Sequence, residues 1–170
     1  MARYPRSRIG RSPSGIRRQG IPAVSTILGS MTPLLPIIAT APIMPPWGLL
    51  VFLAWRMLHR TLWPVWMGLP LGFVDDMFSG QPLGSAIMLW TIALLGLDLL
   101  DRRMIWRDFW QEWAIAGSLI IAILLAQLLM SYASGGATNP LVLVPQIVAS
   151  VLFFPLVARI CASLDTWRLS

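Results

Sequence analysis

The sequence predicts an all-α integral membrane protein with six transmembrane helices and both termini in the cytoplasm. Apolar residues make up 56% of the 170-residue chain and charged residues only 12%. Such a chain cannot cover its surface with polar groups. All 13 basic residues are arginines: six lie within the first eighteen residues and the others near the ends of alternate apolar segments. Arginine accumulates in cytoplasmic loops, so this spacing predicts that the apolar segments cross the membrane in pairs.

The net charge of +6 is also explained by this topology. The arginines flank apolar segments instead of forming one basic face, which favours attraction to anionic lipid over nucleic-acid binding. The single cysteine, Cys161, excludes an internal disulfide and a cysteine-based metal cluster. No cleavable signal is expected, because a full-length apolar segment follows the arginine-rich tail without a convincing cleavage site.

The first part of the chain, residues 1–20, is expected to be a disordered, basic cytoplasmic tail. The membrane domain is expected to cover residues 21–165. Its first span is predicted at about residues 23–41, where Pro33 and Pro36 should bend the helix because proline removes a backbone donor.

The second span, at about residues 46–58, is short for a hydrocarbon core of about 30 Å. Arg56 is therefore expected to extend its side chain to the cytoplasmic interface, or the bilayer is expected to thin beside it. The lone histidine, His59, is expected to be an interfacial residue and not a ligand.

The third and fourth spans are predicted at about residues 62–78 and 83–100. Asp98 and Asp101 are spaced i, i+3 at the end of the fourth span, beside two arginines. We interpret them as an interfacial charge cluster and not as a metal site, because no further carboxylates accompany them.

Residues 101–113 are predicted to form an amphipathic interfacial helix between the fourth and fifth spans, because aromatic residues recur there at helical spacing. The fifth and sixth spans are predicted at about residues 114–132 and 140–160. Residues 166–170 complete the chain as a cytoplasmic C-terminus.

The most informative motif lies between the third and fourth spans, in the segment GFVDDMFSGQPLG. A carboxylate at membrane depth is costly, so Asp76 should face protein or water and not lipid. We expect it to cap the N–H groups at the start of the fourth helix, and ion or substrate binding is the alternative. Gly68 and Gly72 would let the two helices approach closely. Asp75 is expected to point elsewhere, at the outer interface.

The sequence gives little support for an enzyme. It has no glycine-rich phosphate loop, no nucleophile elbow, and no His–Cys or His–His pair. We therefore predict no catalytic residue, no cofactor and no metal.

The same motif resembles that of the MreD family of bacterial rod shape-determining membrane proteins, in which an aspartate precedes Ser-Gly-x-x-Leu-Gly. Pro46-Trp47 with the leucines after it also resembles the family's second span. The candidate structural or partner-interface residues carried over by this resemblance are Gly72, Asp76, Ser79, Gly80, Leu83, Gly84, Pro46 and Trp47. Asp75 matches no family position, and the arginine-rich tail is longer than the family pattern.

The resemblance implies a non-enzymatic inner-membrane component of the rod-shape complex, or elongasome. Such a protein would bind MreC, act indirectly with MreB, RodA and a class B penicillin-binding transpeptidase, and help to regulate lateral peptidoglycan synthesis. The family is similar in architecture to the substrate-binding subunits of energy-coupling-factor vitamin transporters. The alternative function is therefore that of a small-molecule-binding membrane carrier subunit.

Overall fold

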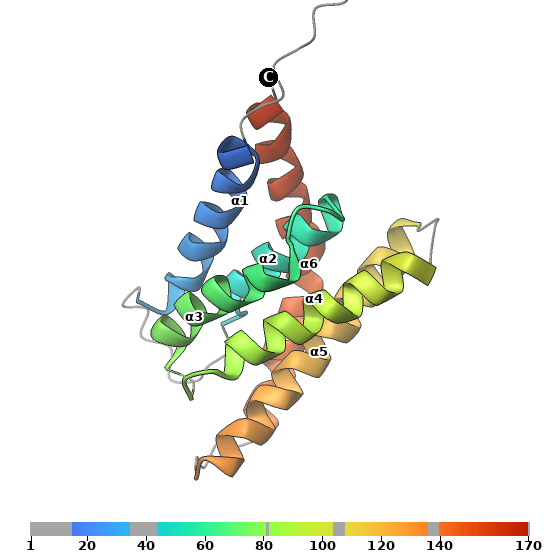
Figure 1. Ribbon diagram of the computed structural model, residues 1–170. Coiled ribbons are helices and arrows are strands. Elements are labelled where there is room, and N and C mark those ends of the chain that lie inside the picture. Colours follow the sequence, from blue (N-terminus) through green and yellow to red (C-terminus); the bar gives the residue numbers. More distant parts are fainter. Residues whose placement is uncertain (1–14, 35–43, 81, 104–107, 136–139, 170) are drawn as a thin grey trace, which may run out of the picture.

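The computed structural model describes residues 15–34, 44–80, 82–103, 108–135 and 140–169 (Figure 1). These residues form helices and no strand. The six α-helices and three short 3₁₀ turns are α1 (Gly15–Ser30), η1 (Thr32–Leu34), α2 (Trp47–Leu58), η2 (Val65–Met67), α3 (Gly68–Ser79), α4 (Ser85–Arg103), α5 (Phe109–Ala133), η3 (Pro140–Val142) and α6 (Leu143–Leu169).

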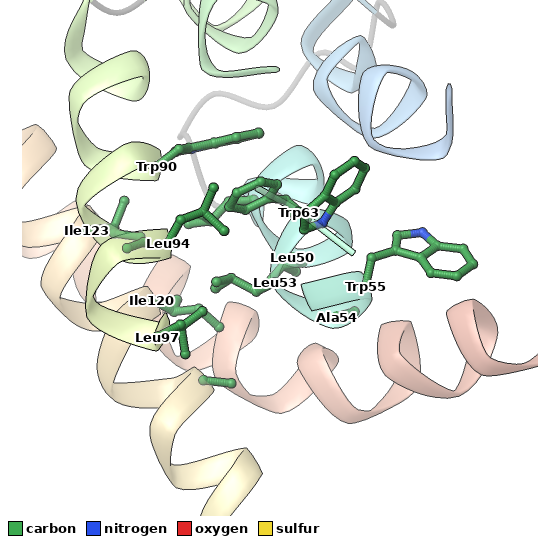
Figure 2. Close-up of a cluster of buried hydrophobic side chains, with 14 of the residues drawn as sticks. Leu50, Leu53, Ala54, Trp55, Trp63, Trp90, Leu94, Leu97, Ile120 and Ile123 are labelled. Carbon is green, nitrogen blue, oxygen red and sulfur yellow. The ribbon is translucent and has the colours of Figure 1, made fainter. Parts of the chain in front are cut away.

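Helix α2 is the centre of the bundle, and eight of its 12 residues are buried, as expected for a mainly apolar helix surrounded by other helices. It packs against α1, α5 and α6. The ring of Phe52 stacks between two indoles, with centroids 6.1 Å from Trp63 and 4.5 Å from Trp90. Figure 2 shows Leu50 and Leu53 of α2 facing Leu94 of α4 and Ile120 of α5. The core therefore joins residues that lie far apart in the sequence, from Leu49 of α2 to Cys161 of α6.

The helix ends fall into two groups. The start of α1 and the end of α6 lie at the same end of the bundle (Figure 1). The ion pairs between α2 and α4, and between the residue after α2 and α6, lie at the C-terminal ends of those three helices.

Two of the described helices, α5 and α6, are long and apolar enough to cross a membrane. Helices α2 and α3 have 12 residues each, which corresponds to about 18 Å of helix. Large apolar side chains are exposed on the outside of the two long helices, including Leu125, Leu129, Leu152 and Ile160. An apolar surface of this extent favours lipid or protein as its surroundings over water.

The predicted tail and first span differ from the structure. Residues 15–20, expected in the tail, already belong to α1, and the α-helix ends at Ser30 and not near residue 41. The early start is stabilised by a hydrogen bond from Gln19 Nε2 to the carbonyl oxygen of Leu62 (3.3 Å). Pro33 lies just after the end of α1, within η1, and so does not bend the helix, whereas Pro36 lies outside the described residues. Residues 1–14 and 35–43 lie outside the described residues.

The separate interfacial helix predicted at residues 101–113 is wrong in its described parts. Residues 101–103 continue α4, and residues 109–113 are the first part of α5, with Asp108 as its N-cap residue. The intervening residues 104–107 lie outside the described residues. The reason is packing, because Asp98 and Asp101 pair with α2 and thereby hold the last turn of α4 in the bundle.

The remaining predicted boundaries agree in part. Helix α2 matches the second predicted span closely, and α5 includes the whole fifth span. Helix α3 begins six residues after the predicted third span, because Pro64 precedes η2 in extended conformation. Helix α6 continues through Leu169, so the predicted C-terminal segment is helical as far as that residue.

Arg56 does not extend its side chain to the interface as expected. The residue is 2% exposed, and its guanidinium forms ion pairs with Asp98 and, at 2.8 Å, with Asp101. His59 is likewise more than an interfacial residue, because its Nε2 lies 2.8 Å from Asp165 Oδ2 on α6. Carboxylates inside the protein pair with these two side chains and take the place of water. The sequence pattern of α2 alone could not reveal these partners, because they belong to α4 and α6.

Candidate functional site

Helices α3 and α4 form the most closely packed pair in the bundle. A Cβ atom added to Gly72 would lie 2.7 Å from the backbone of Ile87, and one added to Gly68 would lie 2.9 Å from the backbone of Thr91. Such distances leave no room for a side chain. The small-residue face predicted for α3 is therefore present, and it brings the backbones of the two helices together.

Asp76 holds the beginning of α4. Its Oδ1 accepts hydrogen bonds from Ser85 Oγ (3.0 Å) and Ala86 N (2.9 Å), and its Oδ2 accepts from Gly84 N (2.9 Å) and Ile87 N (3.3 Å). Three of these donors are backbone N–H groups at a helix start, which have no partner within the helix. The capping role expected for Asp76 is thus present in the geometry.

The turn between α3 and α4 needs glycine at two positions. Gly80 ends α3 with φ of 66°, and Gly84 precedes α4 with φ of 98°. Residues that carry a side chain rarely adopt this left-handed region of backbone conformation. Leu83 lies between them with its side chain 77% exposed, so it contributes little to the packing of the turn and is available at the surface.

A cavity of about 470 Å³ lies beside this hairpin, at the end of the bundle where α1 and α3 end and α2 and α6 begin. Pro46 and Trp47, two of the predicted site residues, line it together with Ser79. The structure therefore places three of the predicted residues in one cavity, whereas Gly72, Asp76 and Gly84 belong to the packing between α3 and α4.

Asp75 was expected to point elsewhere than Asp76, at the outer interface, and its side chain does point elsewhere, into a cavity of the bundle. The residue is 8% exposed, lines the cavity, and accepts a hydrogen bond from Ser30 Oγ at 2.7 Å. Gly48 makes this contact possible, because a Cβ atom there would lie 2.2 Å from Ser30 Oγ and 2.7 Å from Asp75 Oδ1. Asp75 thus connects the end of α1 to α3 at the place where α2 crosses them.

Sequence reasoning missed several polar residues of this cavity: Ser30, Thr32, Gln127, Ser131 and Gln146. They come from α1, η1, α5 and α6, so no local motif contains them. One signal could have identified Asp75. A carboxylate at membrane depth is costly, and this argument applies to Asp75 as much as to the adjacent Asp76.

The polar side chains that line the cavity are suited to binding. The described residues contain no group of three or more His, Cys, Asp or Glu side chains that could hold a metal ion. The only titratable side chain of those lining the cavity, within the described part of the chain, is Asp75. A single carboxylate with neighbouring hydroxyl and amide groups can accept hydrogen bonds and balance a positive charge.

Comparison with known proteins identifies the family. Neither a curated protein nor a solved structure matches the chain. The family model described as rod shape-determining protein MreD matches residues 21–163, which includes all of the helices α2 to α5 and the greater part of α1 and α6. Because this match covers most of the sequence, the chain belongs to the MreD family of rod shape-determining proteins.

Proposed function

We propose that the protein is a non-enzymatic component of the complex that maintains rod shape, and that it binds MreC and helps to regulate lateral peptidoglycan synthesis. The observation that carries the proposal is the family match over residues 21–163. The family is one of shape-determining membrane proteins, so the coarser role in rod shape follows from membership. Action with MreB, RodA and a class B penicillin-binding transpeptidase would be indirect, through MreC.

The outer surface of the bundle supports a role in assembly. Large apolar side chains are exposed on α5 and α6, the two helices long enough to span a bilayer. In lipid, helices associate through close packing of their surfaces, since the hydrophobic effect no longer drives them together. We propose that part of this surface contacts a transmembrane helix of MreC.

We further propose the bacterial inner membrane as its location, with six spans and both termini in the cytoplasm. The arginines of the described residues support this orientation, because they lie in the first turn of α1 and toward, or just after, the C-terminal ends of α2, α4 and α6. The cavity would then open toward the outer leaflet. The basic tail would attract anionic lipid of the inner leaflet.

Depletion of the protein in its native bacterium tests the role. Fluorescent cell-wall precursors would be supplied while the protein is depleted, and cells would be followed by microscopy. We expect rounding and loss of side-wall labelling, both restored by the intact gene. Co-purification of the protein with MreC in mild detergent, from cells that have not been depleted, tests the partner separately. Unchanged shape and labelling would contradict the proposal.

The cavity favours one alternative, a small-molecule carrier subunit. Its volume of about 470 Å³ lies within the range of about 300–1,000 Å³ found for ligand pockets. A carrier would move labelled ligand across vesicles that contain its partner subunits, and its depletion would leave cell shape unchanged. The same microscopy therefore separates the two functions.

A further inference from the structure

The cavity between the ends of α1, α3 and α5 and the starts of α2 and α6 has a distinct charge pattern. Asp75 supplies a carboxylate that is 8% exposed, and none of the described residues lining the cavity is basic. The four ion pairs of the described residues involve Asp98, Asp101 and Asp165, and none includes Asp75. The negative charge of Asp75 therefore has no cationic partner in this part of the protein.

The neighbouring Asp76 has a different set of hydrogen-bond partners from Asp75. Among the described residues, Asp76 accepts four hydrogen bonds at the positive end of a helix, whereas Asp75 accepts one, from Ser30. A helix start favours negative charge, so the fold itself stabilises Asp76. A buried carboxylate that lacks such partners is costly and is therefore suited to a cation that arrives from outside.

Ser79 provides a second, independent feature of the same cavity. Its Oγ is buried and has no hydrogen-bond partner among the described residues. Ser79 lies four residues after Asp75 on α3, so the two side chains share one face of the helix. A buried hydroxyl without a partner is uncommon in a folded protein, and a bound ligand would satisfy it.

The rest of the cavity wall is mainly apolar. Trp47, Leu124, Leu128 and Leu143 line it, and the side-chain amides of Gln127 and Gln146 add further polar groups. Apolar walls suit a hydrocarbon stem, and an indole also attracts cations through its ring face. A metal ion fits less well, because one carboxylate with hydroxyls and amides beside an apolar wall is not a full set of ligands for it.

We propose that this cavity binds a small amphipathic organic cation, an ammonium group on an apolar stem, with Asp75 as its counter-ion. Ser79 Oγ accepts one N–H of the ammonium group, and the stem lies against Trp47 and the leucines. This chemistry has two possible sources, a free amine or the ammonium head group of phosphatidylethanolamine. The inference goes beyond the role in cell shape and holds whether or not MreC binds.

Calorimetry on the full-length protein in an uncharged detergent tests the proposal. The probe is benzylammonium, and the neutral control is benzyl alcohol, which has nearly the same shape. We expect saturable binding of benzylammonium only. Asp75→Asn should weaken it at least tenfold and Ser79→Ala a few-fold. Asp108→Asn makes the same charge change at an exposed residue at the other end of α5, and should leave binding unchanged.

A second variant keeps the test valid if Asp75→Asn does not fold. Leu128→Trp keeps the carboxylate but fills the cavity, so it should also abolish binding. Native mass spectrometry after reconstitution in phosphatidylglycerol with a minor fraction of phosphatidylethanolamine then distinguishes the sources. Retained phosphatidylethanolamine that is lost in Asp75→Asn identifies the lipid, and benzylammonium binding without retained lipid identifies a free amine. Equal binding of both probes, no binding of either probe or lipid, or binding unaffected by both Asp75→Asn and Leu128→Trp would overturn the proposal.

Discussion

The carboxylate of Asp76 accepts a hydrogen bond from the backbone N–H of Gly84 at 2.9 Å, and this contact closes the hairpin between α3 and α4. Gly84 can present its N–H in this way because it adopts φ of 98°. Gly84 thus ends the turn, and Asp76, which lies eight residues earlier in the sequence, caps the start of α4. In the structure, the motif that resembles the MreD pattern holds two helices together.

Replacing Asp76 should destabilise the protein in proportion to the hydrogen bonds lost. Asp76→Ala removes all four, and we expect a loss of about 2–4 kcal/mol in the free energy of unfolding, because helix-start donors inside the bundle lose their acceptor. Asp76→Asn keeps one acceptor oxygen and should cost roughly half as much. Thermal unfolding in detergent measures both. Equal stability of Asp76→Ala and the native protein would rule out the capping role.

Gly72→Ala should separate α3 from α4. The added Cβ atom would lie 2.7 Å from the backbone of Ile87, which cannot move without shifting the helix. We expect a loss of about 1–3 kcal/mol, as for overpacking elsewhere. Gly96→Ala is the matched control on α4, since no atom lies within 4 Å of its Cβ position, and it should be neutral or slightly stabilising. Similar melting temperatures for the two variants would contradict this account.

Arg56 should be essential to the stability of the bundle. Arg56→Met leaves Asp98 and Asp101 without their shared cation, and removing one partner of a buried ion pair costs about 3–5 kcal/mol. Asp101→Asn should cost more than Asp98→Asn, because the side chain of Asp101 is 15% exposed and that of Asp98 38%. A double-mutant cycle between Arg56→Met and Asp101→Asn should show a coupling energy of about 1 kcal/mol or more. Additive effects would mean that the pair contributes nothing.

The proposed topology predicts which introduced cysteines react from each side of the membrane. Cys161 is buried and would first be replaced by serine. A cysteine at Ser134, exposed after α5, should react with an impermeant maleimide added to intact spheroplasts. A cysteine at Thr166, exposed near the end of α6, should react only after the membrane is opened. The reverse pattern would place both termini outside the cytoplasm.

The sequence by itself determined the features that depend on local chemistry. Apolar composition and arginine spacing predicted a helical membrane protein, and in the described residues the structure confirms an all-helical fold with two helices long and apolar enough to cross a membrane. The residues from Gly72 to Gly84 predicted both the close helix pair and the family, because glycine positions and an aspartate cap act over a few residues.

Only the tertiary structure decided where the buried charges lie. Asp75 and Asp76 are neighbours in sequence, yet one meets Ser30 of α1 in a cavity and the other meets the start of α4. Arg56 would need water on an isolated helix, but it finds Asp98 and Asp101 from α4 within the protein. The partners of Asp75 and Arg56 are more than 40 residues away along the chain, and burial removes the water that would otherwise solvate each charge. Which partner replaces that water depends on how the helices pack, and no local pattern contains this information.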